Sequence, residues 1–181
     1  VLFALDLTPN RPDAMSILGV ARDLAARLGV PFAVPSIDVP EEGEPIGGIV
    51  GVEILDPVLC GRMTVRVLTD VPAGPSPDLV ARRLTLMGMR PISAMVDLSN
   101  YVMLEYGQPN HAYDLDLVAG RSLRVRRAVD GEEMETLDGQ RRVLCATDGV
   151  IADGDDTPIG IAGVMGGANT EMSERSTDVL L

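Results

Sequence analysis

Histidine, cysteine and tryptophan are scarce in this chain, which has 181 residues but one histidine, two cysteines and no tryptophan. Two cysteines are too few for a disulfide framework, and the wide separation of Cys60 and Cys145 lacks the paired spacing of a zinc site. A reducing compartment is the simpler inference, and both thiols are expected in the core. A single histidine gives no basis for a Ser-His-acid triad, and a metal site would need carboxylates brought from afar.

Long apolar runs and a basic excess are also missing. No apolar run approaches the roughly 18 residues that span a bilayer, and no basic segment followed by an apolar stretch marks secretion, so a cytoplasmic protein is predicted. The 15 basic residues are outnumbered by 27 acidic ones, giving a formal net charge of −12. Nucleic-acid binding without sequence preference depends on cations that displace counterions from phosphates, so this balance argues against a free-standing binder. Any contact with nucleic acid must be local or assisted.

Hydrophobic periodicity predicts an α+β fold: a short N-terminal helical segment, then a mixed domain with two or more helices and a second half built as a β meander or barrel. Helices are predicted over 14–28, 77–87 and 92–104. Gly29 is expected to end the first helix and Ser76 to cap the second. Strands are predicted over 49–55, 62–68 and from Val179 onward. Four Asp-Gly pairs have the spacing of hairpin turns, at Asp130, Asp138, Asp148 and Asp153.

Composition divides the chain into three parts. Residues 1–29 are predicted to be the helical end of a preceding module, 30–48 a linker rich in proline and acidic residues, and 49–181 the main domain. A lone helix cannot bury its own apolar face, and the chain opens at Val-Leu-Phe without an initiator methionine, so a longer parent protein is expected. The last predicted strand is interrupted, so we expect the main domain to be truncated at its C-terminal end.

The segment 90–114 carries the single histidine, His111, among an amide, hydroxyls and an arginine. Imidazole has an unperturbed pKa near neutrality, so His111 is a candidate for positioning water or a polar ligand; the alternative is a structural histidine. The Gly-rich segment 159–167 allows a backbone to approach a ligand or another strand. The candidate hydrogen-bonding groups are Arg90, Ser99, Asn100, His111 and the backbone amides of 163–167. Such fixed groups can place a water beside an already reactive ester.

Five motifs extend along nearly the whole chain. They are Thr8 to Asp13 continuing to Gly29, Arg90-Pro-Ile with 96–105, Gly107 to Asp114, Thr136 to Gly139, and Gly163 to Gly167. In order and spacing they resemble the beta subunit of bacterial phenylalanyl-tRNA synthetase. The resemblance covers the end of the first module of that subunit and most of its editing region, in the third and fourth modules.

The resemblance implies post-transfer editing, which is the hydrolysis of tyrosine wrongly esterified to tRNA(Phe). Water would be the nucleophile, without a covalent enzyme intermediate. A pocket shaped for phenylalanine cannot strongly reject an analogue that adds one hydroxyl, whereas a second pocket that hydrogen-bonds this hydroxyl can prefer tyrosine. The first pocket therefore admits both amino acids, and the second pocket prefers tyrosine.

The resemblance also implies roles for individual residues. His111 and Asn100 would position the water and the ester. The substrate-binding positions would be Ser99, Arg90 near the terminal adenosine, and the glycine wall of Gly163 and Gly166. Ser99 keeps the hydroxyl of the threonine that many relatives carry, while Asn110 and Tyr113 replace an apolar residue and a phenylalanine beside the histidine. No metal is implied.

The family's carboxylate that reads the tyrosine hydroxyl directly follows the Leu-Leu pair, and here no residue follows Leu181. We therefore expect an incomplete tyrosine pocket in this chain and weak or no editing by it alone.

The implied partners are the 3′ end of tRNA(Phe) and a synthetase alpha subunit, in an enzyme of two alpha and two beta subunits, without a membrane. No cofactor is expected here; ATP and Mg²⁺ would serve only the whole synthetase. The alternative is a non-catalytic tRNA-binding, protein-binding or scaffold module of the same fold.

Overall fold

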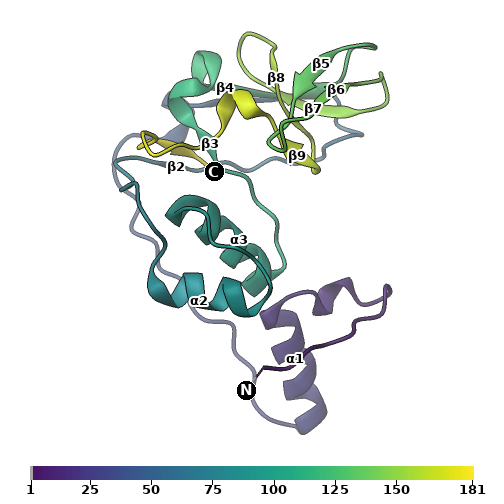
Figure 1. Ribbon diagram of the computed structural model, residues 1–181, viewed down its shortest axis with the longest axis vertical. Coiled ribbons are helices and arrows are strands. Elements are labelled where there is room, and N and C mark those ends of the chain that lie inside the picture. The colour runs from purple at the N-terminus through teal and green to yellow at the C-terminus, as the bar shows by residue number, and fades with distance from the viewer. Residues whose placement is uncertain (1) are drawn as a thin grey trace. The chain divides into compact units, whose positions relative to one another are not determined.

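The computed structural model describes residues 2–181 and confirms an α+β fold with mostly antiparallel strands (Figure 1). The chain forms two compact units. The helical unit comprises the residues up to Glu42 together with Gly74–Asn110, and the sheet unit comprises Gly43–Ala73 and His111–Leu181. Each unit is a set of residues that contact one another, and this division does not test the predicted domain boundaries. The division into 1–29, 30–48 and 49–181 therefore stays a prediction.

Three α-helices form the helical unit among the described residues: α1 (Ile17–Leu28), α2 (Asp78–Leu86) and α3 (Ala94–Tyr106). α1 begins later than predicted, after a 3-10 helix at Pro12–Ala14. The Ser16 hydroxyl caps it by accepting a hydrogen bond from the Gly19 backbone N–H at 2.9 Å. Gly29 ends it in the left-handed conformation, with φ 66°, which confirms the predicted C-terminal cap.

The predicted serine cap of α2 is wrong. Pro77 occupies the N-cap position without a side-chain hydrogen bond, while the Ser76 hydroxyl donates to the carboxylate of Asp97 in α3. Asp97 is 1% exposed and also accepts from the Ile92 backbone N–H at 2.8 Å. A buried carboxylate is costly unless it is hydrogen-bonded. Ser76 therefore satisfies Asp97 instead of the helix end.

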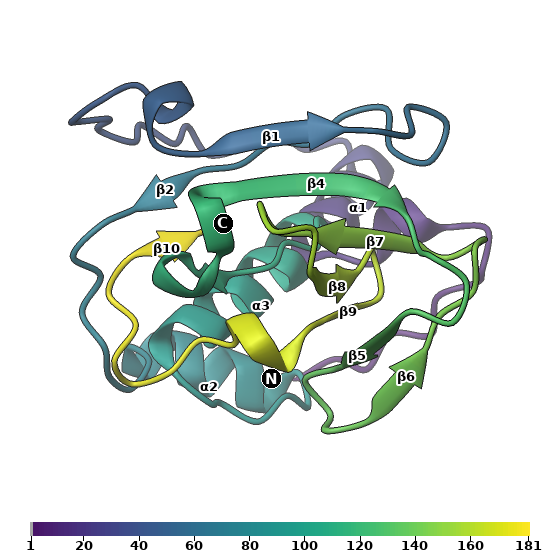
Figure 2. The ribbon, with the colours of Figure 1, turned by 90° about the horizontal axis from the view of Figure 1, so that it is seen from above.

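The sheet unit contains two sheets and a separate hairpin. The larger sheet has the order β1-β4-β7-β8-β9, and Figure 2 shows β4 between β1 and β7. Its strands are β1 (Gly51–Ile54), β4 (Ser122–Arg127), β7 (Gly149–Ala152), β8 (Pro158–Ile161) and β9 (Met165–Gly166). The smaller sheet has the order β2-β10-β3, and the hairpin pairs β5 with β6. These strands are β2 (Val67–Leu68), β10 (Val179–Leu180), β3 (Tyr113–Asp114), β5 (Glu133–Glu135) and β6 (Arg141–Val143).

Across residues 2–181 the strands form open sheets and no closed barrel, so the meander is the correct alternative for β7, β8 and β9. β1 pairs with β4 in parallel, which the predicted hairpin pattern does not contain. The Asp-Gly pairs at Asp138 and Asp153 turn between directly paired strands, whereas those at Asp130 and Asp148 lead from one sheet to another. The predicted strand 62–68 is reduced to β2.

The main core lies between strands of the two sheets. Its buried members are Val50, Tyr113, Leu115, Val118, Leu123, Ile159 and Leu180. A second cluster lies beneath the hairpin and contains Ala128, Met134, Leu144 and Val150. The predicted burial of both cysteines is wrong, because Cys145 is exposed and Cys60 is only half-buried. Cys145 opens a turn in which its backbone N–H donates to the Asp148 carboxylate at 2.9 Å.

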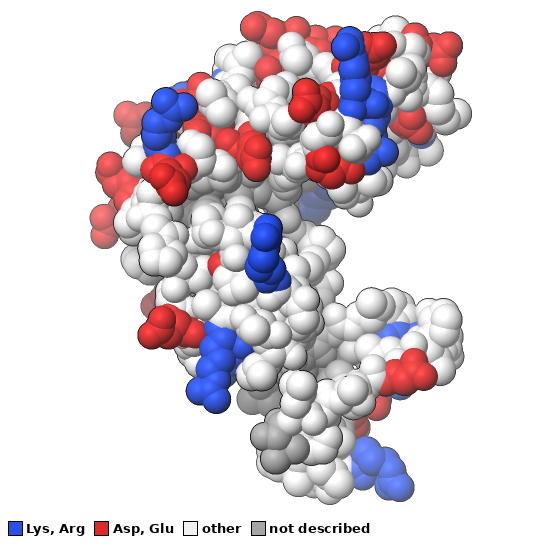
Figure 3. Space-filling model, in the orientation of Figure 1, with Lys and Arg blue, Asp and Glu red and all other residues white. Residues whose placement is uncertain are grey.

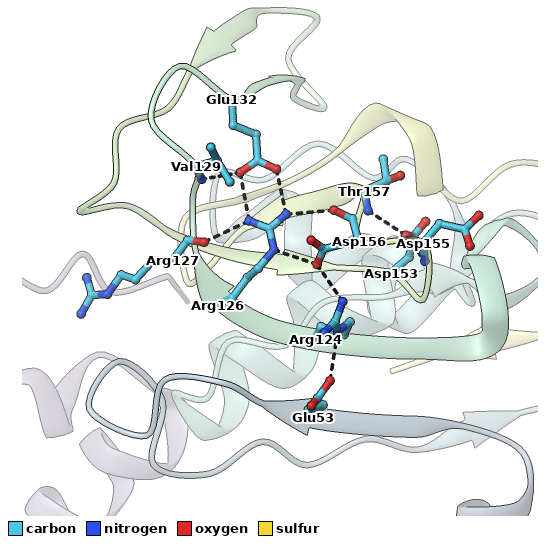
Figure 4. A network of polar contacts seen from close by, with 10 residues as sticks. All are labelled: Glu53, Arg124, Arg126, Arg127, Val129, Glu132, Asp153, Asp155, Asp156 and Thr157. Atoms are coloured by element: carbon cyan, nitrogen blue, oxygen red, sulfur yellow. Dashed lines mark hydrogen bonds and ion pairs between the residues drawn. The ribbon is translucent and has the colours of Figure 1, made fainter.

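A network of ion pairs joins β1, β4 and the turn between β7 and β8, with Arg126 at its centre (Figure 4). The Arg126 guanidinium donates to the Glu132 carboxylate at 2.8 and 3.0 Å and to Asp156 at 2.9 Å. Arg124 extends the network from Asp156, at 3.1 Å, to Glu53 of β1, at 3.0 Å. Hydrogen bonding to Arg126 holds the pKa of Glu132 below its ordinary value. The side chain of Arg126 is only 11% exposed, so this pair is shielded from solvent.

Replacing Arg126 by methionine is expected to lower the free energy of unfolding by roughly 2–4 kcal/mol, because Glu132 would stay largely buried without its partner. Arg141→Met is the matched control. The Arg141 side chain is 77% exposed and pairs with Glu133, so its loss should cost about 0.5 kcal/mol or less. Equilibrium urea unfolding of both variants measures the difference. Equally small losses in the two variants would contradict the assigned role of Arg126.

Candidate functional site

The single histidine lies against the last strand of the larger sheet. His111 lies two residues before β3, and a Cβ placed on Gly166 of β9 would overlap its ring atoms Cε1 and Nε2. Such overlap does not occur between real atoms, so the imidazole occupies its position only because residue 166 has no side chain. The structure thus brings together two of the predicted site residues from distant parts of the sequence.

Tyr113 contacts the imidazole, and Leu137 lies beside the same position of Gly166. The rings of Tyr113 and His111 meet edge to face, with centroids 4.6 Å apart and planes at 79°. Leu137 donates its backbone N–H to the Gly166 carbonyl at 3.0 Å, and its Cδ1 lies 3.2 Å from the Cβ position at Gly166. Sequence reasoning misses Leu137 as a site residue, although the Thr-Leu-Asp-Gly motif that contains it is visible. Only the fold shows which strand this motif contacts.

Burial sets the protonation of both rings. It lowers the pKa of His111 below its ordinary value, so the imidazole is neutral at neutral pH. It raises the pKa of Tyr113 to about 12, so the phenol keeps its proton. A neutral imidazole has one nitrogen that donates and one that accepts a hydrogen bond. His111 can therefore orient a water molecule without adding a positive charge to the site.

Gly163 lies in the turn between β8 and β9. Its φ of 71° is in the left-handed region that favours glycine, and the space beside it is open. Two neighbouring amides are used within the sheet: Val164 donates to the Ile161 carbonyl at 3.0 Å, and Gly167 to the Ile159 carbonyl at 2.7 Å. These two are not free to bind an ester, which narrows the predicted set of backbone amides. The role of Gly163 in a glycine wall stays a prediction.

The other predicted site residues belong to the helical unit. Ser99 and Asn100 lie half-buried in α3, and Arg90 is exposed between α2 and α3. The Ser99 hydroxyl donates to the Asn110 carbonyl, and the Asn110 side-chain amide donates to the Ser99 carbonyl, both at 3.3 Å. Asn110 Oδ1 is buried and accepts no hydrogen bond from the described residues. The pair of reciprocal bonds ties α3 to the segment that leads into His111.

Charge on the protein follows its acidic composition. All 15 basic residues are arginines, and on the face drawn in Figure 3 they stand singly or beside acidic side chains. Several of those in the sheet unit form ion pairs with carboxylates: Arg121, Arg124, Arg126, Arg127, Arg141 and Arg142. Phosphate contacts by these side chains would have to compete with existing ion pairs.

The described residues contain neither a helix that could cross a membrane nor a cluster of metal ligands. In the part of the chain from residue 2 onward, no helix combines the length and apolarity needed to cross a membrane. Over the same residues, no group of three or more His, Cys, Asp or Glu side chains is arranged to hold a metal ion. The expectation of a site that uses no metal stays a prediction.

The fold and the site define an α+β chain whose single histidine packs against a glycine of the edge strand β9. Residues 59–181 match the model of the B3/4 domain, and the chain belongs to the B3/4 domain family. This match extends over the sheet unit from Leu59 onward and over α2 and α3, so it includes all six predicted site residues.

The chain is also similar to phenylalanine–tRNA ligase beta subunits, which confirms the resemblance seen in the motifs. It is 47% identical to that of Geobacter sulfurreducens over 180 residues, which are 99% of this chain and 22% of the relative. It is 47% identical to that of Moorella thermoacetica over 181 residues, which are 100% of this chain and 22% of the relative. The chain thus spans about a fifth of the length of these relatives. A crystal structure of an N-terminal fragment of the beta subunit from Pyrococcus horikoshii has 16% identity and a TM-score of 0.49, over 94% of this chain and 51% of that one.

The pKa of His111 is expected below its ordinary value of 6.5, because burial disfavours the imidazolium. The unfolded chain then binds the proton more tightly than the folded chain. The contribution of His111 to the free energy of unfolding should be fully present above pH 6.5 and should be lost as pH falls through 6.5 toward the lower, folded pKa. NMR titration of the ring Cε1–H signal measures the pKa without ambiguity, since the chain has one histidine. A value at or above 6.5 would contradict the assigned burial.

Gly166→Ala is expected to displace the His111 ring, because the new methyl group would overlap it. Overpacking of this kind typically costs about 1–3 kcal/mol. The variant should shift the Cε1–H signal of His111 and lower the free energy of unfolding. Gly61→Ala is the control, because Gly61 has open space around it and no positive φ. An unchanged histidine signal in Gly166→Ala would show that the ring does not lie on β9.

Proposed function

We propose that this chain is part of the editing region of a phenylalanine–tRNA ligase beta subunit, a region that hydrolyses tyrosine wrongly esterified to tRNA(Phe). The observation that carries the proposal is the neutral imidazole of His111 held on the backbone of Gly166. A fixed, uncharged imidazole beside polar groups is suited to orient water toward an ester. Similarity to phenylalanine–tRNA ligase beta subunits over nearly the whole chain supplies the substrate class.

The proposed chemistry is addition of water to an ester that is already activated. The water oxygen attacks the carbonyl carbon, the bond from that carbon to the ribose oxygen breaks, and the ribose oxygen takes up a proton. The products are free tyrosine and uncharged tRNA. Because aminoacyl esters are reactive, placement of the water and support for the developing oxyanion are the main tasks left to the protein.

By the family resemblance, His111 and Asn100 would place the water and the ester, and Ser99 would bind the substrate. Arg90 is exposed, as a residue that meets the terminal adenosine must be. By the family resemblance, Gly163 and Gly166 would form the glycine wall of the site. The space beside Gly163 is open, whereas the space beside Gly166 holds the imidazole. Each of these roles rests on the family resemblance together with local geometry within one unit.

The acidic balance of the chain is compatible with this proposal. Other parts of the synthetase, including the alpha subunit, would hold the tRNA body and raise the effective concentration of its 3′ end at this site. ATP and Mg²⁺ would act in the activation step elsewhere in that enzyme, with no cofactor in this chain. A cytoplasmic location follows from the same assignment.

A second candidate function is a protein-binding or scaffold module. The observation that favours it is the apolar surface of α1, where Ile17, Leu24 and Leu28 are 55%, 55% and 65% exposed. Apolar side chains gathered on one helix commonly mark a surface covered by another protein segment. This candidate predicts that substitutions at His111 change stability or assembly without changing ester hydrolysis.

Deacylation of tyrosyl-tRNA(Phe) and phenylalanyl-tRNA(Phe) by the full-length synthetase that contains this sequence tests the proposal. The tyrosyl ester should be cleaved faster, and His111→Ala should slow that cleavage by roughly 100-fold, as the loss of a positioned hydrogen-bonding group does. Arg141→Met, an exposed substitution in the sheet unit, serves as the control and should retain full activity. Stable tyrosyl ester in the presence of folded wild-type enzyme would favour the binding or scaffold function instead.

A further inference from the structure

The β5–β6 hairpin reaches the His111 site through Thr136 and Leu137. Thr136 directly follows β5, is fully buried, and forms a β-bridge with Gly167. The next residue, Leu137, donates its backbone N–H to the Gly166 carbonyl at 3.0 Å. One end of the hairpin is therefore fastened to the strand segment on which the imidazole lies.

A closed set of hydrogen bonds fixes the conformation of this hairpin end. The Thr136 hydroxyl donates to Asp138 Oδ1 at 2.6 Å and accepts from Arg142 Nε at 3.0 Å. Arg142 also donates to Asp138 Oδ2 at 2.6 Å, and Asp138 Oδ1 accepts from the Gln140 backbone N–H at 3.2 Å. The Thr136 hydroxyl is the buried member of this cluster, and it uses both its donor and an acceptor position.

The cluster acts on the site through Leu137. The Cδ1 atom of this side chain lies 3.2 Å from the Cβ position at Gly166, which is also the position that the imidazole of His111 approaches. Leu137 is 39% exposed, so it presents an apolar edge beside the half-buried imidazole. A change in the hairpin end would move Leu137 and the strand beneath His111 together.

We propose that Thr136 is a positioning residue for ester hydrolysis: its hydroxyl, with Asp138 and Arg142, holds Leu137 and β9 so that His111 keeps its orientation. This inference rests on the proposed function. Leu137 is then the apolar wall that excludes water other than the one held by the imidazole. Neither role involves contact between Thr136 and the substrate.

The ion-pair network around Arg126 shows what a structural role alone looks like in the same unit. Arg126 binds Glu132, Asp156 and the Arg127 carbonyl, and among the described residues these hydrogen bonds reach neither β9 nor His111. The Thr136 cluster instead ends on the residues that carry the imidazole. The difference predicts a kinetic effect for Thr136 that loss of stability does not produce.

The test compares Thr136→Val, Thr136→Ser and Arg141→Met in the full-length synthetase, with tyrosyl-tRNA(Phe) as substrate. Valine keeps the shape of threonine but removes the hydrogen bonds of the hydroxyl to Asp138, Gln140 and Arg142, so kcat for hydrolysis should fall about 10-fold or more with KM changed less than about twofold. Serine keeps the hydroxyl and should restore kcat to within about threefold of wild type. Arg141→Met lies in the same hairpin outside the cluster and should match wild type. Attachment of phenylalanine to tRNA(Phe) takes place elsewhere in the proposed enzyme. An unchanged rate of this reaction shows that a variant is assembled.

The outcomes are distinguishable. Wild-type kcat in an assembled Thr136→Val enzyme would overturn this inference and leave the proposed function standing. A loss in Thr136→Ser as large as in Thr136→Val would also overturn it, because the hydroxyl would then not be the cause. Absence of tyrosyl-ester hydrolysis by the wild-type enzyme would overturn the proposed function and this inference with it. If Thr136→Val does not assemble, Asp138→Asn decides, since it weakens the same cluster from the surface and should lower kcat in the same way.

Discussion

The contact between the imidazole of His111 and the backbone of Gly166 is the constraint on which the rest of the site depends. It requires a residue without a side chain at position 166, an aromatic edge from Tyr113 beside the ring, and a hairpin that keeps β9 in place. Burial of the ring at this position lowers its pKa. The position of the ring thus decides both its steric fit and its protonation state.

Two polar clusters of the sheet unit have different consequences. The network of Arg126 joins β4 to Glu132 and to the β7–β8 turn through a shielded ion pair, so it acts mainly on stability (Figure 4). The cluster of Thr136 holds one hairpin end to β9, so it acts on the placement of His111. Buried polar groups in this unit therefore serve both folding and alignment.

Local features of the fold could be predicted from the sequence, because they depend on neighbouring residues. Gly29 ends α1 as predicted, and the Asp-Gly pair at Asp138 turns the β5–β6 hairpin. Features that depend on distant residues could not. β1 pairs in parallel with β4, whose residues lie 71 positions later in the sequence. The Ser76 hydroxyl donates to the Asp97 carboxylate and does not cap α2. A capping pattern does not reveal a buried carboxylate on another helix.

The site residues divide in the same way, into those that the sequence reveals and those that only the fold reveals. His111 is identifiable from its chemistry, and Gly166 from its place in a Gly-rich segment, but Leu137 becomes a site residue only through the pairing of the hairpin with β9. The direct test is a nuclear Overhauser measurement on the ring Cε1–H of the single histidine. The account predicts strong cross-peaks to the Gly166 Hα protons and to a Leu137 methyl group. Cross-peaks to other residues without these two would contradict it.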